Sequence, residues 1–447
     1  MSEKITIIGA GPVGILLALY LAQKGYPVDL YEKRGNPASQ PKAEGRSINL
    51  ALSMRGLHAL KEVGLEQELL KQGVQMRGRM IHSIGQDPHF IPYSPHQSHA
   101  IYSIGRSELS KILLQKTEKY PAISVTFNEE CLGIDLKEQT LHFHNTLTND
   151  RHQRPFTILF DAEGTGSAVR TSLLKQPYTS YSQEYLNYDY KELTLPSLRG
   201  HYQLEKEALH LWPRGNQLMI ALPNPDGTFT CTLFLPRTGN PNFLNLDTSL
   251  KANQFFKDVF PDAFPLFDEL EEQFFLNPIG SLMTIRIAPW TYHGAYQGMV
   301  LLIGDSAHGI VPFYGQGLNC GFEDCSFLNA CIDKFQGDWE AIFHEYEEGR
   351  KKNTDAIAEL SFDNFVELRE KVADPVFQLK RKLETALEEA YPHEFMSKYS
   401  MVTFSLIPYE EALIRGRRQD EILMKACARA SSLAELNLAE IMAMIRS

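Results

Sequence analysis

The sequence lacks the cysteine patterns that mark disulfide scaffolds and structural metal sites. Its 447 residues include six cysteines, but none forms a CxxC pair and none has histidine partners at metal-ligand spacing. Free thiols suit a reducing cytoplasm, and no bound metal is expected. Cys320, Cys325 and Cys331 cluster within a predicted helix, where we interpret them as small apolar packing residues.

Long apolar runs and an excess of positive charge are absent as well. The longest apolar stretch, residues 15–22, is far shorter than the roughly 20 residues that cross a bilayer. A predicted strand begins within a few residues of the N-terminus, which leaves no room for a signal peptide. The formal net charge of -11 at pH 7 argues against a general affinity for nucleic acid or anionic membranes. We therefore expect a cytoplasmic protein without a membrane anchor.

The chain does contain a dinucleotide-binding pattern at its start. An apolar run over residues 5–8 is followed by Gly9, Gly11 and Gly14, and these glycines open a predicted helix over residues 13–24. Glycines at this spacing permit a tight turn and let the backbone approach a pyrophosphate closely. The N-terminus of the helix supplies free N–H groups for the anion.

A second predicted strand, residues 28–31, ends at Glu32. At the end of such a strand, a carboxylate can accept hydrogen bonds from ribose hydroxyls. A glycine-rich turn with a purely structural role would not explain Glu32. The strand, turn, helix and acid together predict a parallel sheet that binds a dinucleotide.

Two later segments have a related strand, turn and helix pattern. The apolar strand at residues 299–303 leads into Gly304 and Asp305, and residues 315–319 then open a helix. The Asp305 carboxylate can bind a ribityl or ribose hydroxyl, and the N–H groups of 315–319 can face a flavin ring. The alternative is a plain connection in which Asp305 caps a helix. Residues 161–170 have the same character, and because no second full fingerprint follows, a second nucleotide would dock without a domain of its own.

The rest of the chain changes character twice. Residues 193–282 alternate apolar and polar side chains with turn signals between them, which predicts an antiparallel sheet, and helical patterns dominate beyond residue 338. The expected fold class is α/β plus antiparallel β, with a Rossmann-like FAD-binding domain, a β-sheet substrate domain and a C-terminal helical region. The expected boundaries are 1–75, 103–180 and 285–365 for the first, 76–102 and 181–284 for the second, and 366–447 for the third.

The three nucleotide-binding segments, in this order, resemble the single-component FAD-dependent aromatic hydroxylases. More specific motifs lie at residues 45–53, 76–83, 229–234 and 399–405, and together they resemble the kynurenine 3-monooxygenase family, in its bacterial form. The resemblance implies bound FAD, with NADPH and O2 as co-substrates. It implies hydroxylation of L-kynurenine to 3-hydroxy-L-kynurenine, in tryptophan degradation toward quinolinate and NAD, by a monomer or homodimer.

The fingerprint and the resemblance together assign the site residues. The cofactor contacts are Gly9, Gly11, Val13, Gly14, Tyr31, Glu32, Lys33, Arg34, Ala51, Arg106, Cys131, Asp305, Gly317, Leu318 and Asn319. The resemblance implies that Arg79 and Tyr93 hold the substrate carboxylate, which suits a guanidinium fork and a phenol hydroxyl. From the residues alone, Arg79 would be a surface arginine and Tyr93 a turn tyrosine. The other implied substrate contacts are Asn364, Tyr399, Leu209, Ile220, Phe234, Pro312, Phe313 and Tyr314. Because the oxygen transfer is chemistry of the flavin C4a position, we name no catalytic protein residue and interpret His308 as structural.

One position departs from the family pattern. Glu163 precedes Gly164 where the family usually has aspartate, and the longer carboxylate is expected to weaken or shift NADPH docking. Two other functions stay open: a related FAD hydroxylase of another aromatic acid, and a catalytically silent flavoprotein used for binding or redox sensing. Glu163 is the only sequence feature that favours the silent flavoprotein.

Overall fold

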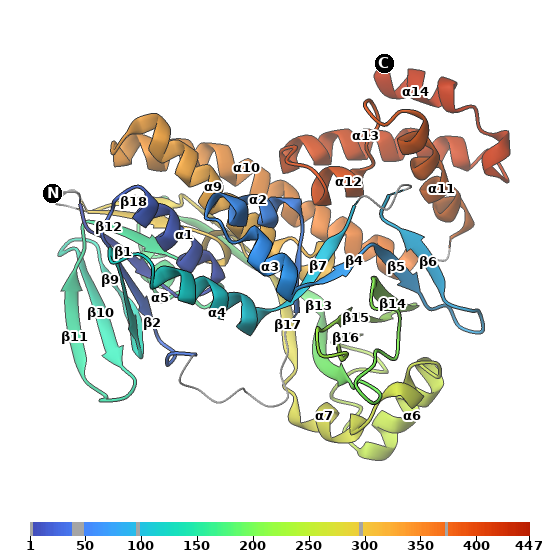
Figure 1. Ribbon diagram of the computed structural model, residues 1–447, viewed down its shortest axis with the longest axis horizontal. Coiled ribbons are helices and arrows are strands. Elements are labelled where there is room, and N and C mark those ends of the chain that lie inside the picture. The colour runs from blue at the N-terminus through green and yellow to red at the C-terminus, as the bar shows by residue number, and fades with distance from the viewer. Residues whose placement is uncertain (1–2, 38–48, 95–98, 295–297, 372–373) are drawn as a thin grey trace.

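A computed structural model describes residues 3–37, 49–94, 99–294, 298–371 and 374–447 (Figure 1). Its first sheet contains β1 (Ile5–Ile8), β2 (Val28–Glu32), β8 (Ile123–Phe127), β12 (Ile158–Asp161), β18 (Thr291–His293) and β19 (Met299–Leu302). These strands follow the order β18-β19-β12-β1-β2-β8. All neighbours run parallel except β18 and β19, as the opening pattern predicts.

Helix α1 (Pro12–Gln23) connects β1 to β2, as predicted. Proline suits its first position because an N–H there would have no partner within the helix. The residues from Gly14 to Leu21 are all buried, which explains why this helix is apolar on every side. Gly25 ends the turn after the helix with a φ of +84°. On the sheet, α1 packs against α4 (Arg106–Thr117) and α9 (Gly317–Phe335).

Two three-stranded sheets and three short helices complete this half of the molecule. One sheet holds β9 (Glu129–Asp135), β10 (Thr140–Asn145) and β11 (Arg151–Pro155), and the other holds β3 (Asn49–Leu52), β4 (Val74–Met76) and β7 (Ile101–Gly105). The helices are α2 (Met54–Glu62), α3 (Glu66–Gln72) and α5 (Ala168–Leu173). Helix α2 packs against α9, so the segment after β3 lies beside the helix that residues 315–319 open.

A seven-stranded sheet forms the second layer of strands. It contains β5 (Gly78–Ile81), β6 (His89–Pro92), β13 (Ser180–Leu195), β14 (Ala208–Arg214), β15 (Gln217–Pro223), β16 (Phe229–Pro236) and β17 (Gly280–Ala288), in the order β17-β13-β16-β15-β14-β5-β6. All neighbours are antiparallel except β14 and β5, which confirms the predicted antiparallel region. Two helices that the alternating pattern did not predict, α6 (Ser249–Val259) and α7 (Leu270–Leu276), pack phenylalanines against one face of this sheet.

Helices dominate the chain after α9, as predicted. Helix α10 (Trp339–Val366) continues into a π-helical turn (Glu367–Lys371), and α11 (Pro375–Ala390), α12 (Lys398–Thr403), α13 (Tyr409–Cys427) and α14 (Leu438–Arg446) follow. In Figure 1 these last four helices, coloured red, lie above β5 and β6. No helix within the described ranges has the length and apolar character that a membrane span requires. The two kinds of sheet and the terminal helices confirm the expected fold class, whereas the domain boundaries stay a prediction.

Candidate active site

The three loops predicted to hold a nucleotide meet at the carboxyl edge of the first sheet. Gly9 follows β1 with a φ of +99°, and a Cβ there would come within 2.5 Å of the Ala162 carbonyl oxygen in the loop after β12. The Val13 side chain lies against the loop after β19 and against α9. A Cβ at Gly304 would lie 3.4 Å from Val13, and a Cβ at Gly321 would lie 2.7 Å from it. The absence of side chains at these glycines therefore lets the three loops touch.

The N-terminus of α1 fits the pyrophosphate of FAD. Gly11 is the N-cap, and no side chain caps this helix. A Cβ built on Gly11 would meet no heavy atom within 4 Å among the described residues, so the approach to the turn is open. A Cβ on Gly14, in contrast, would lie 2.0 Å from the Gly9 carbonyl oxygen. Free N–H groups at an open helix terminus are what a diphosphate requires.

Glu32 braces this turn from the end of β2. Its Oε2 accepts a 2.9 Å hydrogen bond from the Ala10 N–H, and its Oε1 accepts one of 2.7 Å from Arg34 Nε. Burial alone would raise the pKa of Glu32, but the bonds from Arg34 and Ala10 outweigh it and lower the pKa. The carboxylate is thus ionised and fixed beside the glycine turn. That it also accepts from a ribose stays a prediction.

The remaining predicted cofactor contacts surround the same loops. They are Tyr31, Lys33 and Arg34 at the end of β2, Ala51 on β3, Arg106 at the start of α4, Cys131 on β9, Asp305 at the start of α8 (Asp305–His308), and Gly317, Leu318 and Asn319 at the start of α9. Residues 45–48 of the 45–53 motif lie outside the described residues.

Two of these contacts already use their side chains inside the protein. The Cys131 thiol is buried and donates to the Gly133 carbonyl oxygen, and burial raises its pKa above the ordinary range. The Asn319 amide donates to the Ala51 carbonyl oxygen at 2.8 Å and accepts from the Ser53 N–H at 2.9 Å. The polar groups of these two side chains therefore hold the loops in place.

Glu163, the departure from the family pattern, caps helix α5. Its Oε2 accepts from the N–H groups of Ala168 and Val169, each at 3.1 Å, and from the Ser167 hydroxyl at 3.3 Å. Burial raises the pKa of Glu163 to about 8, and the neighbouring Asp161 carboxylate adds to the shift. The carboxyl group therefore points toward its own helix. The expected effect on NADPH docking stays a prediction.

Arg79 and Tyr93, implied to hold a carboxylate, lie in an aromatic enclosure. The guanidinium carbon of Arg79 is 4.3 Å from the ring centroid of Tyr399 and 5.9 Å from that of Tyr93, and the two rings stack at 5.5 Å. Arg79 Nε and the Tyr93 hydroxyl are both buried without a hydrogen-bond partner in the described part of the chain. An unsatisfied buried donor costs roughly 1–3 kcal/mol, so a ligand with acceptor oxygens would relieve this cost, and such a contact stays a prediction.

The other predicted substrate contacts extend from this pair toward the second sheet. They lie on β14 (Leu209), β15 (Ile220), β16 (Phe234), the one-turn helix η2 (Pro312, Phe313 and Tyr314), α10 (Asn364) and α12 (Tyr399). Tyr314 stacks on Tyr399 at 5.5 Å, and Phe313 lies 5.0 Å from Phe234. Asn364 donates to the Phe313 carbonyl oxygen at 2.7 Å and so fixes this turn. The structure brings these side chains together, and their contact with a substrate stays a prediction.

A buried ion network beside this site was missed from the sequence. His308, Cys320 and Asp324 come together from α8 and α9, closely enough to hold a metal ion. However, Arg350 Nε donates to Asp324 at 2.8 Å, and its Nη2 lies 3.4 Å from Cys320 Sγ. Burial alone would lower the pKa of His308, but Asp324 raises it well above the ordinary value. Since two cations already neutralise Asp324, the group is better explained as an ion network than as a metal site.

Comparison with known proteins decides the family. A protein-family model described as "FAD binding domain" matches residues 2–360. The chain is 42% identical over 446 residues to the kynurenine 3-monooxygenase of Myxococcus xanthus (strain DK1622), covering 100% of this chain and 95% of the relative. It is 43% identical over 437 residues to that of Dictyostelium discoideum, covering 95% and 93%. The chain belongs to the kynurenine 3-monooxygenase family.

Membership of the kynurenine 3-monooxygenase family confirms the predicted cofactor class: the chain is an FAD-dependent monooxygenase. Solved structures agree on the fold. The tetrameric form of 2-methyl-3-hydroxypyridine-5-carboxylic acid oxygenase matches with a TM-score of 0.66 at 18% identity, covering 87% of this chain and 98% of that one. A tetracycline destructase matches with a TM-score of 0.59 at 16% identity, covering 83% and 90%. At such identities these structures show the fold alone.

Proposed function

We propose that this chain hydroxylates L-kynurenine to 3-hydroxy-L-kynurenine, with NADPH and O2 as co-substrates. The activity named for its relatives supports the proposal. The single observation that carries it is the buried pair of Arg79 Nε and the Tyr93 hydroxyl, which lack a partner in the described part of the chain. An amino acid with an aromatic side chain offers a carboxylate to this pair and a ring to the apolar and aromatic residues beyond it.

The protein's own part in this reaction is binding and orientation. Bound FAD supplies the acceptor for the NADPH hydride and the activation of O2. Arg79 and Tyr93 bind the carboxylate, which fixes where the other end of the substrate lies. The rings of Phe313, Tyr314 and Phe234 enclose the aromatic ring and exclude water. The amino group on the substrate ring already activates the carbon next to it, so no protein base is required.

The cofactor contacts follow from the same arrangement. The open N-terminus of α1 would hold the diphosphate, and Asp305 and the start of α9 would border the ribityl chain and the ring. Since only one glycine fingerprint is present in the sequence, NADPH docks transiently rather than in a domain of its own. We propose a cytoplasmic protein that works as a monomer or homodimer.

The test is a product assay. The purified, FAD-loaded protein is incubated with NADPH, O2 and L-kynurenine, and mass spectrometry is used to detect the gain of one oxygen atom. A second incubation contains 4-hydroxybenzoate in place of L-kynurenine. Hydroxylation of the benzoate alone would replace the proposal with the related hydroxylase. A flavin-containing protein that oxidises no NADPH with either compound would favour the silent flavoprotein.

A further inference from the structure

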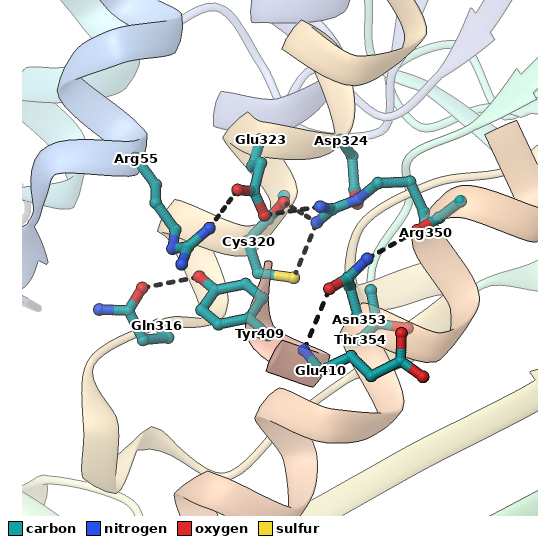
Figure 2. A network of polar contacts seen from close by, with 12 residues as sticks. Arg55, Gln316, Cys320, Glu323, Asp324, Arg350, Asn353, Thr354, Tyr409 and Glu410 are labelled. Carbon is teal, nitrogen blue, oxygen red and sulfur yellow. Dashed lines mark hydrogen bonds and ion pairs between the residues drawn. The ribbon is translucent and has the colours of Figure 1, made fainter. Parts of the chain in front are cut away.

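A buried arginine, drawn with some of its polar neighbours in Figure 2, connects helix α12 to the segment that supports the predicted flavin loop, residues 315–319. Arg55 lies in the first turn of α2, and its side chain is completely buried. Figure 2 shows it facing Glu323, with the Tyr409 ring beneath it. Neither the sequence motifs nor the proposed substrate contacts include Arg55. A buried guanidinium is costly unless its donors are satisfied, so its partners indicate what it does.

The partners of Arg55 on one side are backbone carbonyls around the end of α12. Its Nε donates to the Val402 carbonyl oxygen at 3.1 Å, and its Nη2 donates to the carbonyl oxygens of Met401 and Ile407. Carbonyls at the C-terminus of a helix have no partner within the helix, and a cation there is favourable. Helix α12 carries Tyr399, whose ring touches both Arg79 and Tyr314.

On its other side, Arg55 is linked through Tyr409 to the predicted flavin loop, residues 315–319. The guanidinium carbon lies 3.9 Å from the Tyr409 ring centroid, which is a cation–π contact. The Tyr409 hydroxyl donates to Gln316 Oε1 at 2.8 Å, and Gln316 is the residue before α9. Arg55 Nη1 also pairs with Glu323, which in turn accepts a 2.6 Å bond from Arg350 Nη1.

The backbone around Arg55 also contacts the loop at residues 315–319. Gly56, four residues after the end of β3, is so close to α9 that a Cβ there would lie 2.4 Å from Asn319 Oδ1. Asn319 itself binds Ser53 and Ala51, as described above. The segment from Ala51 to Gly56 therefore contacts the start of α9 directly and the end of α12 through Arg55.

We propose that Arg55 is a positioning residue: it fixes α12, and with it Tyr399, relative to the loop at residues 315–319. This inference rests on the proposed hydroxylation. Transfer of an oxygen atom requires the substrate carbon at a set distance from the flavin, and a shift of about 1 Å can cost on the order of a hundredfold in rate. A lysine at this position keeps the charge, but it cannot satisfy three carbonyls, a carboxylate and a ring at once.

The test compares Arg55→Lys with a matched arginine elsewhere. Arg214 is also buried, binds the Val259 and His82 carbonyl oxygens and pairs with Asp262, but it lies at the end of β14 away from α12. In Arg55→Lys we expect the ratio of hydroxylated product to NADPH consumed to fall at least fivefold, with the difference released as hydrogen peroxide. Backbone hydrogen exchange in residues 400–408 should become at least tenfold faster, with or without FAD. Arg214→Lys should lower the melting temperature but leave both the product ratio and this exchange as in the parent protein.

Two outcomes overturn the inference: Arg55→Lys with the parent product ratio and exchange, or Arg214→Lys with an equal loss of both. Should Arg55→Lys not fold, Tyr409→Phe decides, because it removes only the hydroxyl that binds Gln316. A lower product ratio in that variant supports the link to the flavin loop, and an unchanged ratio refutes it. The parent protein is assayed first. If it forms no hydroxylated kynurenine, the proposed function fails, while the exchange measurement still tests the hold of Arg55 on α12.

Discussion

Replacing Arg79 with methionine should weaken substrate binding without lowering the stability of the protein. In the free protein this guanidinium lies against Tyr399 at 4.3 Å, and its Nε is buried without a partner in the described residues. The buried Nε therefore carries a desolvation cost that the aromatic contact offsets in part. Methionine fills a similar apolar volume and removes that cost. We expect Arg79→Met to fold, to retain FAD and to melt at the same or a higher temperature than the parent protein.

The effect on kynurenine should be large. A hydrogen bond to a charged group contributes about 1.5–3 kcal/mol, and the guanidinium can make two such bonds to a carboxylate. The loss of both is worth about 3–6 kcal/mol, which corresponds to a roughly hundredfold to ten-thousandfold weaker Kd. The KM for kynurenine should rise by a similar factor.

The assay is a titration of the flavin absorbance with kynurenine in the absence of NADPH, together with thermal unfolding. Arg77→Met is the matched control, because Arg77 lies two residues away and pairs with Glu207 at a partly exposed position. It should change the kynurenine Kd by less than a factor of about five, since Arg77 is not one of the predicted carboxylate contacts and surface pairs contribute about 0–1 kcal/mol. Parent-like kynurenine binding in Arg79→Met, or a loss of stability without a loss of binding, would refute the carboxylate assignment.

Three further changes test other parts of the site. Tyr93→Phe removes the unpaired hydroxyl, and we expect a kynurenine Kd about 5- to 30-fold weaker, from about 1–2 kcal/mol, with unchanged melting; a parent-like Kd would remove Tyr93 from the clamp. Gly14→Ala places a Cβ 2.0 Å from the Gly9 carbonyl oxygen, so the purified protein should contain little FAD. The FAD content is measured as the ratio of flavin to protein absorbance, and full occupancy would contradict the tight turn. Glu163→Gln tests the raised pKa: because the folded value is about 8 and the ordinary value 4.5, the folded state holds the proton more tightly, and its stability falls as pH rises from 4.5 through 8. The glutamine variant should lose this decline, which is on the order of 1–3 kcal/mol after allowing for partial exposure. The measurement is thermal unfolding of both proteins across this pH range. Parallel pH dependence in the variant and the parent protein would count against the raised pKa.

The parts of the fold that depend on local sequence were predictable. Gly9, Gly11 and Gly14 specify a turn through their own backbone freedom, so the strand, turn and helix at the start match the structure closely. The strands near 208–235 were likewise visible, because their alternation has a period of two. Helices α6 and α7 were missed because their phenylalanines favour strands by propensity and mimic alternation over short stretches.

The site depends on contacts between distant segments, and these were less visible. Arg79 on β5 is enclosed by the ring of Tyr399 on α12, more than three hundred residues later, and no local pattern shows that. The partners of Arg55 include backbone carbonyls, which every sequence has. A signal was available in Glu323 and Asp324, two adjacent acids in the buried stretch of a helix. Acids placed there require cations from elsewhere, and Arg55 and Arg350 are those cations.

The same geometry favours an amino acid with a distant ring over a benzoate. The Tyr399 ring contacts the Arg79 guanidinium and also stacks on the Tyr314 ring. Tyr314 is followed directly by Gly315, where the predicted flavin loop begins. A compound that binds Arg79 and also reaches this loop must therefore extend along the Tyr399 and Tyr314 rings. In kynurenine a side chain separates the carboxylate from the ring, whereas in a benzoate the carboxylate is attached to the ring itself. A benzoate bound at Arg79 would leave its reacting carbon beside Tyr399, and one bound near the loop would leave Arg79 buried and unpaired.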